Sequence, residues 1–258
     1  MTKPWWAGTM RHSLASLLGC ARARERFPDL DFVDRAAEAL VERVGLRAGM
    51  FRDEELKPLV LVAMTLDVVL EQRLAQRPGL TVVHLGGGLS TRPLRLRGLA
   101  RRWIDVEEPA AAEMKRELWG EWPGYSLVDC EPGDTRWVDA LAEPPGQRLL
   151  LVSESGLLEA SPGDFHAVLD AVTHRLPRGT ELLFAHDRRH PIRAEEGASL
   201  LVERATEQGE RLQIRYPRLR LVPRDAHDED VWMALEGIEA LHALQGGRLP
   251  RITHVALA

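Results

Sequence analysis

The chain has 258 residues, of which 45% are hydrophobic and 28% charged, which is typical of a folded globular protein with a sizeable core. Its formal net charge of −5 at pH 7 gives no electrostatic reason to expect a nucleic acid as partner. The sequence contains no apolar run of the roughly 18–20 residues that span a bilayer, so we expect no membrane partner and a cytoplasmic protein.

The first third of the chain has the periodicity of helices. Apolar residues recur at helical spacing over 31–44, behind Asp31 as a possible N-cap. Residues 53–77 form a longer stretch that is apolar on one side and ends at Pro78. We therefore expect residues 1–78 to form a helical cap.

After the cap, short apolar runs alternate with polar helical stretches. Strands alternating with helices predict a doubly wound α/β domain over 79–258, with a mainly parallel sheet of about seven strands. The helical stretches include 109–122 and 161–176. The expected strands are 80–85, 101–106, 125–130, 148–154, 180–186, 218–223 and 251–258.

Three glycines, Gly86, Gly87 and Gly88, follow directly after the first expected strand. This is the carboxyl edge of the sheet, where open α/β folds bind their ligands. Glycine lets a ligand approach the main chain and leaves N–H groups free to point at it. A dinucleotide-binding loop would have a further glycine where this chain has Thr91, and a glycine-rich turn without a ligand is the simpler alternative.

Acidic residues end the next strands. Glu107 ends the second strand about twenty residues beyond the glycines, with Asp105 two residues earlier. A carboxylate at this place accepts hydrogen bonds from both ribose hydroxyls of an adenosine, a feature that NAD and S-adenosylmethionine share. Glu154 ends the fourth strand and would face a cationic ligand group. Each acid taken alone is better explained as a solvated carboxylate at a strand end, but several successive strand ends that carry acids point to one ligand.

The motifs resemble those of a known family. "HLGGGLSTRPLRL" resembles the "LGaGlDtRxxRL" signature of the leucine carboxyl methyltransferase family, whose bacterial members include polyketide O-methyltransferases. "RWIDVEEPAAAEMKREL" is similar to the family's "WxxvDlPxvixxRxxL", and "LLLVSESGLLEA" to its "xiaEGllmYl" strand. The resemblance covers roughly residues 18–190 and implies a Rossmann-like methyltransferase fold.

The resemblance implies an S-adenosylmethionine site at the glycines and the first acids. Gly86 and Gly88 would lie under the methionine part of the cofactor. Glu107 would hold the ribose hydroxyls, with Asp105 as the competing candidate.

The same resemblance assigns the remaining cofactor contacts. Glu131 and Pro132 would flank the adenine, and Glu154 would meet the amino group of the methionine part. Arg22 would come down from the cap onto the methionine carboxylate.

The chain departs from the family pattern at several positions. Ser90 and Glu107 stand where the family usually has Asp, and Ala63 stands where a helix arginine is common. Glu159 replaces a typical tyrosine. These departures put the carboxylate clamp in question and indicate a changed acceptor pocket.

Methyl transfer from a sulfonium needs a general base only for some acceptors. A carboxylic acid is already ionised at neutral pH, whereas a hydroxyl benefits from a base. His186, at the end of the fifth strand, is the candidate base, the alternative being a structural or solvated histidine. His12 on the N-terminal arm is a further candidate at the acceptor.

Tryptophans near the N-terminus and before the last helix are candidate acceptor contacts. Trp5 and Trp6 are adjacent, and burying both requires something to cover them. One interpretation is an aromatic lid over an apolar acceptor, and the other is packing on the cap or at a dimer contact. Trp232 raises the same two possibilities.

The resulting prediction is an S-adenosylmethionine-dependent O-methyltransferase acting on a carboxylate or hydroxyl of a small, polyketide-like molecule, as a monomer or homodimer. An NAD(P)-dependent oxidoreductase and a non-catalytic relative that binds S-adenosylmethionine are the alternatives. We expect no metal site, because His227 lacks ligand-spaced partners and Cys20 and Cys130 are too few and too far apart for a zinc site.

Overall fold

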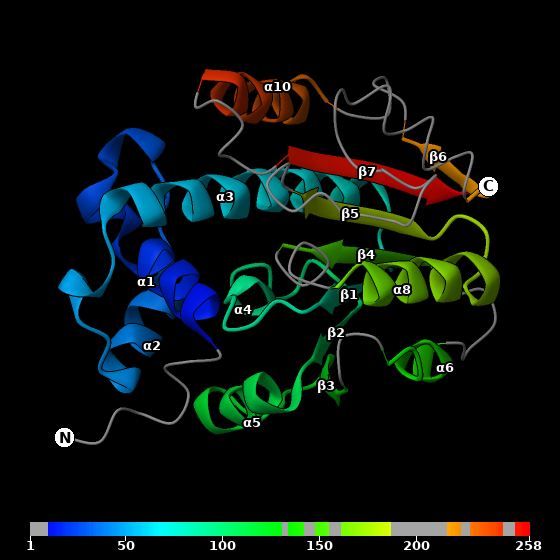
Figure 1. The fold of residues 1–258 in the computed structure, drawn as a ribbon, viewed down its shortest axis with the longest axis horizontal. Helices are drawn as coiled ribbons and strands as arrows, with labels where there is room; N and C mark the ends of the chain where they lie inside the picture. The colour runs from blue at the N-terminus through cyan, green and yellow to red at the C-terminus, as the bar shows by residue number, and fades with distance from the viewer. Residues whose placement is uncertain are drawn as a thin grey trace.

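The computed structural model describes residues 10–130, 134–141, 148–154, 161–186, 216–222, 228–244 and 251–258. They contain a seven-stranded sheet in the order β3-β2-β1-β4-β5-β7-β6 (Figure 1). Only β7 runs antiparallel to its neighbours, so the predicted doubly wound, mainly parallel α/β fold is confirmed. The strands are β1 (Thr81–Leu85), β2 (Arg102–Glu107), β3 (Tyr125–Asp129), β4 (Leu149–Ser153), β5 (Glu181–His186), β6 (Leu219–Leu221) and β7 (Arg251–Leu257).

Helices cover both faces of the sheet. α3 (Asp53–Gln76), α5 (Pro109–Leu118) and α10 (Glu229–Leu244) lie on one face, and α6 (Trp137–Leu141) and α8 (Pro162–Arg175) on the other. Alternate residues of each strand therefore enter different cores: Val82 packs with α3, and Val83 packs with α8. Because both faces are buried, the strands read as nearly continuous apolar runs.

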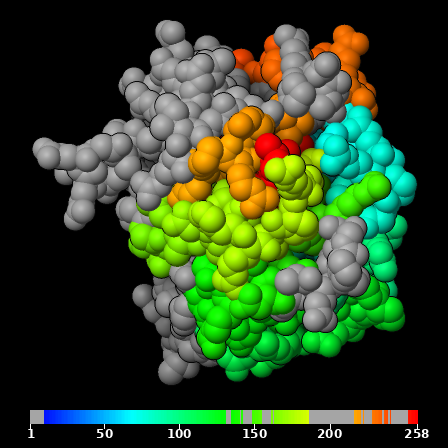
Figure 2. All heavy atoms as spheres, turned by 90° about the vertical axis from the view of Figure 1, so that its right-hand side faces the viewer, coloured from blue at the N-terminus to red at the C-terminus, as the bar shows by residue number. Residues whose placement is uncertain are grey.

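A second group of helices lies over the carboxyl ends of the parallel strands. α1 (Arg11–Arg26), α2 (Arg35–Val44) and the first half of α3 share their own hydrophobic core, and the short turns η2 (Pro28–Leu30) and η3 (Ala48–Met50) connect them. Figure 1 shows this group at one end of the sheet, next to α4 (Arg92–Arg95). Figure 2 views the other end, where α3, α8 and β7 reach the surface and no part of α1 or α2 is seen.

The start of α2 corrects the sequence-based prediction. The helix begins at Arg35, where the Asp34 side chain accepts a hydrogen bond from the Ala37 N–H at 2.9 Å. Asp31, the expected cap, instead ends η2 in the left-handed region, with φ +46°. The apolar spacing begins directly after Asp31, but the chain turns at Asp31 and the helix starts only at Arg35.

α3 joins the two cores. Leu56 and Val60 near its start pack in the core of the cap, whereas Leu66 and Leu70 pack against the sheet. The expected division of the chain after residue 78 stays a prediction, because this 24-residue helix belongs to both sides of it. None of the helices in the described ranges combines the length and apolar character needed to cross a membrane.

Candidate functional site

The loop after β1 needs glycine for reasons within the protein. Gly86 and Gly88 have φ of +60° and +54°, a region that residues with a side chain rarely adopt. A Cβ on Gly87 would lie 2.1 Å from the ring of His84, which is fully buried. The glycines are therefore required by the shape of the loop and by the packing of His84, and not only by an approaching ligand.

Gly88 joins the loop to β2 and to the cap. Its N–H donates to Glu107 Oε2 at 3.0 Å, which places that carboxylate beside the glycine loop. A Cβ on Gly88 would lie 2.0 Å from Ser13 Oγ of α1. The space above Gly88 thus holds a small polar side chain of the cap.

Residues 103, 105 and 107 alternate along β2 and lie on the face that α3 and α5 cover. Asp105 is fully buried and accepts hydrogen bonds from Trp103 Nε1 at 2.9 Å and from Tyr125 OH at 2.8 Å. Lys115 Nζ of α5 lies 2.6 Å from Asp105 and also pairs with Glu107. Of the two acids that compete for the ribose role, Asp105 is enclosed by protein donors, and Glu107 contacts the loop.

The two carboxyl groups have opposite pKa shifts. Burial raises the pKa of Glu107 to about 7, since Lys115 only partly offsets burial and the charge of Asp105. Burial also opposes ionisation of Asp105, but Lys115 and His84 outweigh it and hold the pKa of Asp105 below its usual value. Burial lowers the pKa of His84, so the imidazole is neutral near pH 7. Asp105 is therefore a fixed charge, whereas Glu107 titrates near neutral pH.

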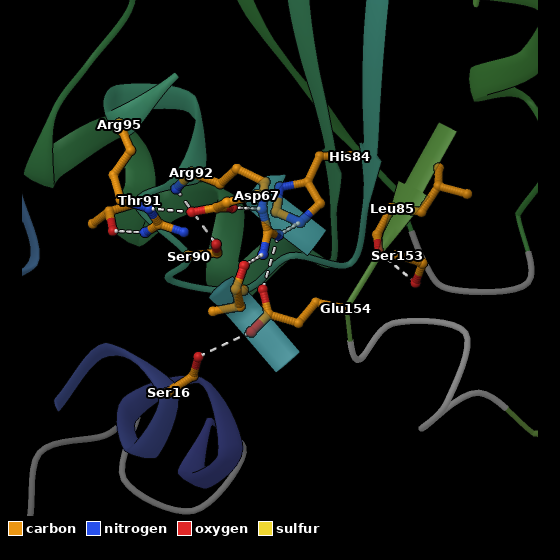
Figure 3. A network of polar contacts seen from close by, with 12 residues as sticks. Ser16, Asp67, His84, Leu85, Ser90, Thr91, Arg92, Arg95, Ser153 and Glu154 are labelled. Atoms are coloured by element: carbon orange, nitrogen blue, oxygen red, sulfur yellow. Dashed lines mark hydrogen bonds and ion pairs between the residues drawn. The ribbon is translucent and has the colours of Figure 1, made fainter. Parts of the chain in front are cut away.

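Glu154 follows β4 and lies at the centre of a second polar cluster (Figure 3). Its Oε2 lies 2.9 Å from Nη1 of Arg92, whose side chain is fully buried. Ser16 Oγ of α1 donates to Glu154 Oε1 at 3.3 Å. Burial opposes ionisation of Glu154, but Arg92 and His84 outweigh it and keep its pKa low. Glu154 is therefore a carboxylate beneath α1.

Asp67 of α3 ties this cluster to the cap. Its two oxygens accept hydrogen bonds from Arg92 Nε at 2.6 Å and from Arg95 Nε at 2.7 Å. Arg95 also pairs with Asp34, and Thr91 Oγ1 donates to the same Asp34 oxygen. Burial disfavours the Asp67 carboxylate, but Arg95 and Arg92 outweigh it and lower its pKa. These ion pairs fix α4 and the glycine loop against the cap.

The two clusters meet at His84. Its Nδ1 lies 3.4 Å from Asp105 Oδ1, and its Nε2 lies 3.3 Å from Arg92 Nη1. A chain of buried polar contacts therefore runs beneath the glycine loop from Glu107 to Glu154.

Two predicted site residues, Arg22 and Trp232, lie away from the glycine loop, and the side chain of a third, His186, is not described. Arg22 is half-exposed and pairs with Glu25 at 3.7 Å; at 100° per residue it lies on the side of α1 opposite Ser13. Trp232 lies one turn after Asp228, which contacts Gln76 at the end of α3, away from the glycine loop. His186 ends β5, but its side chain is outside the described residues.

The remaining predicted residues lie at the start of α1, in the core of the cap or outside the described residues. His12 is half-buried in the first turn of α1, next to Ser13. Trp5, Trp6, Glu131 and Pro132 lie outside the described residues. Ala63 is buried in the cap core, and its carbonyl accepts from Arg92 Nη2 at 3.4 Å. Within the described ranges, no group of His, Cys, Asp and Glu side chains is arranged to hold a metal ion.

Sequence reasoning missed Lys115, Arg92 and His84 as parts of the site. Two acids on one face of a buried strand need a nearby cation, and the helix that follows the strand supplies a lysine, Lys115, eight residues after Glu107. Arg92 lies in the "STRPLRL" stretch that carried the family resemblance. His84 interrupts an apolar strand just before the glycines, which is where a buried polar residue contacts the loop.

The arrangement fits an adenosine cofactor with a cationic end. Glu107 offers a carboxylate beside a backbone N–H, and Glu154 offers a second carboxylate at the end of the strand next to β1. Glu107 is 2% and Glu154 6% exposed, and Ser13 lies over Gly88 while Ser16 contacts Glu154, so a cofactor between the two acids would have to displace both serines.

One curated relative matches part of the chain. The tetracenomycin polyketide synthesis O-methyltransferase TcmP of Streptomyces glaucescens is 27% identical over 176 residues, which are 66% of this chain. The match spans 64% of the relative's length. No family model matches the chain.

Solved structures of methyltransferases resemble the fold at low identity. Magnesium protoporphyrin IX methyltransferase (ChlM) from Synechocystis PCC 6803, solved with bound SAH, has a TM-score of 0.46 at 10% identity, covering 92% of this chain and 98% of its own. The mitomycin 7-O-methyltransferase MmcR has a TM-score of 0.43 at 17% identity, covering 87% of this chain and 68% of its own. Likeness at this level carries no argument about the activity.

Proposed function

We propose that the chain is an S-adenosylmethionine-dependent O-methyltransferase. The observation that carries the proposal is the contact between Gly88 N–H and Glu107 at the carboxyl edge of the sheet, 3.0 Å long. A carboxylate at the end of the second strand, beside the glycine loop of the first, is the arrangement that holds an adenosine ribose. The similarity to a polyketide O-methyltransferase supports the same assignment.

Each part of the proposed site has its own task. Glu107 would accept the ribose hydroxyls, and the backbone of Gly86 and Gly88 would lie against the methionine part. Glu154, kept ionised by Arg92, would bind the amino group. Glu131, Pro132 and Arg22 remain the proposed contacts to the adenine and the carboxylate. When bound, the cofactor supplies an electrophilic methyl group, and the protein's part is to align the acceptor and exclude water.

The proposed acceptor is a carboxylate or hydroxyl of a small biosynthetic molecule, polyketide-like in view of the relative's product. A hydroxyl acceptor would use His186 as general base, whereas a carboxylate acceptor would need none. α1 covers the glycine loop. The proposed wall of the acceptor site is formed by the residues at or before the start of α1 in the sequence, namely Trp5, Trp6 and His12. We propose a cytoplasmic monomer or homodimer.

Calorimetric titration with S-adenosylhomocysteine tests the site. Glu107→Ala removes the ribose acceptor and should weaken binding about ten- to a hundredfold, because hydrogen bonds to a charged group contribute roughly 1.5–3 kcal/mol. Gly88→Val should abolish binding, since its side chain would lie where the methionine part is proposed to approach the loop and would also clash with Ser13 Oγ. Glu113→Ala, an exposed acid on α5, is the matched control and should bind normally.

The same titration separates the alternatives. Binding of NAD in place of S-adenosylhomocysteine would make the chain an oxidoreductase. Binding of S-adenosylhomocysteine without methyl transfer to any carboxylate or phenol in a mass-spectrometric screen would leave the non-catalytic alternative. Unchanged affinity in both Glu107→Ala and Gly88→Val would refute the site.

A further inference from the structure

Lys115 is a fully buried cation between two carboxylates. Its Nζ lies 2.6 Å from Asp105 Oδ2 and pairs with Glu107 Oε1, and its charge lies 5.6 Å from the ring centre of Trp119. Its side chain is 0% exposed. A lysine is rarely buried completely, because removing its charge from water costs several kcal/mol unless close partners repay the cost. The pair with Asp105 alone would satisfy that need, so the second contact, to Glu107, calls for its own explanation.

Glu107 is held at two points. Lys115 approaches one carboxylate oxygen from α5, and Gly88 N–H approaches the other from the glycine loop. A carboxylate has about four acceptor positions, two on each oxygen. The two protein donors take one position on each oxygen and leave one on each for the adjacent hydroxyls of a ribose.

We propose that Lys115 is a positioning residue of the cofactor site: it orients Glu107 and favours its carboxylate form, so that both of its oxygens accept the ribose hydroxyls. This inference rests on the proposed function. Lys115 itself is too deep to touch the cofactor, and it acts only through Glu107.

The charges around Glu107 set the direction of the expected effect. The charged groups are Lys115 on α5, Asp105 on the same strand and Arg92 beyond His84. The neutral titratable groups are His84 on β1, the Tyr125 hydroxyl on β3 and the Cys130 thiol just after it. Burial and Asp105 disfavour the Glu107 carboxylate, and Lys115 favours it. Removing Lys115 therefore raises the pH needed to ionise Glu107, and removing the charge of Asp105 lowers it.

The experiment measures S-adenosylhomocysteine affinity by calorimetry between about pH 5.5 and 9, a range that brackets the ionisation of a buried carboxyl group. The affinity of each variant is divided by the affinity of the unmodified protein at the same pH, so that the effect of ionisation of the ligand cancels. Lys115→Met should shift the midpoint of binding upward by at least about one pH unit, because an opposite charge this close lowers a carboxyl pKa by roughly 1–3 units. Asp105→Asn should shift it downward.

Two further variants complete the test. Arg116→Met removes an exposed cation from the neighbouring position of α5 and should leave the midpoint unchanged. Lys115→Gln, which keeps a donor but no charge, should shift the midpoint upward and replaces Lys115→Met if that variant does not fold.

The outcomes are distinguishable. A uniform loss of affinity at every pH in the Lys115 variants, or a midpoint that moves the same way in Asp105→Asn, would overturn the positioning role. If the unmodified protein does not bind S-adenosylhomocysteine at all, the proposed function fails. Binding with an unchanged midpoint in all variants refutes only the role of Lys115.

Discussion

At the scale of single residues, the contact between Gly87 and His84 explains why the loop has a glycine at its centre. The imidazole has 0% exposure and lies between Arg92 at 3.3 Å and Asp105 at 3.4 Å, so it has no room to move. Gly87→Ala forces a Cβ against this ring and should lower the free energy of unfolding by about 1–3 kcal/mol, as overpacking of a core does. Urea denaturation measures the change.

Two comparisons make that test specific. Gly49→Ala places a Cβ where nothing lies within 4 Å and should be nearly neutral. In a His84→Ala background, Gly87→Ala should cost much less than in the unmodified protein, because the obstructing ring is gone. Equal costs in both backgrounds would show that His84 is not the reason for the glycine.

At the scale of elements, Asp34 does two things for α2. It caps the helix through Ala37 N–H, and it pairs with Arg95 of α4, so it fixes the helix to the ion pairs below the loop. Asp34→Asn keeps the oxygen that caps the helix and replaces the other oxygen, which accepts from Thr91 and pairs with Arg95, by an NH2 group. Asp34→Ala removes the capping oxygen as well. Asp34→Ala should therefore be the less stable of the two by about 0.5–2 kcal/mol in chemical denaturation.

The cap of α8 provides the control for this pair. Ser161 accepts from Asp164 N–H at 3.1 Å on an exposed helix start, without an ion pair. Ser161→Ala should cost about 0.5–2 kcal/mol, the same as the difference between the two Asp34 variants. If Asp34→Asn and Asp34→Ala are equally stable, capping contributes nothing at α2.

At the scale of the whole molecule, a buried ion cluster joins the end of α3 to β5 and β7. Glu181 of β5 accepts from Arg73 of α3 at 2.6 and 2.9 Å, and Arg77 Nη1 and His254 Nε2 lie 2.6 and 2.8 Å from it. Burial opposes its ionisation, but His254 and Arg73 outweigh it and lower the pKa of Glu181 from 4.5 to about 2. The cluster fixes α3, which packs in both the cap core and the sheet core, against the sheet.

The sign of its pH dependence follows. A carboxyl with a lowered pKa in the folded state contributes stability that is fully present above its unfolded pKa and lost as the pH falls. We expect the free energy of unfolding to decrease between pH 4.5 and about 2 through Glu181. Glu181→Gln should lower stability near neutral pH by about 3–5 kcal/mol, as breaking a buried pair does, and flatten the acid dependence in that window. An equally steep acid dependence in the variant would assign it to other carboxyls.

The sequence by itself determined the architecture. All seven strands lie where short apolar runs predicted them, because a parallel sheet covered on both faces needs uninterrupted apolar segments and local composition records that need. The helices 53–77 and 161–176 were predicted within two residues, since their apolar spacing and end residues are local. The sequence also predicted that Gly86–Gly88, Glu107 and Glu154 lie at one edge of the sheet, because they follow or end parallel strands and parallel strands end on the same side.

Only the tertiary structure decided which charged residues are buried and what they bind. In the sequence, Asp105 and Glu107 are two equally suitable acids on one strand. Their different roles depend on the donors that enclose Asp105, which are Trp103 on the same strand, Lys115 of α5 and Tyr125 of β3. The position of Arg22 depends on how α1 is rotated over the loop, which its sequence does not specify, because several faces of that helix are apolar. Burial sets the cost of a charge, and burial is a property of the packed molecule that no single segment contains.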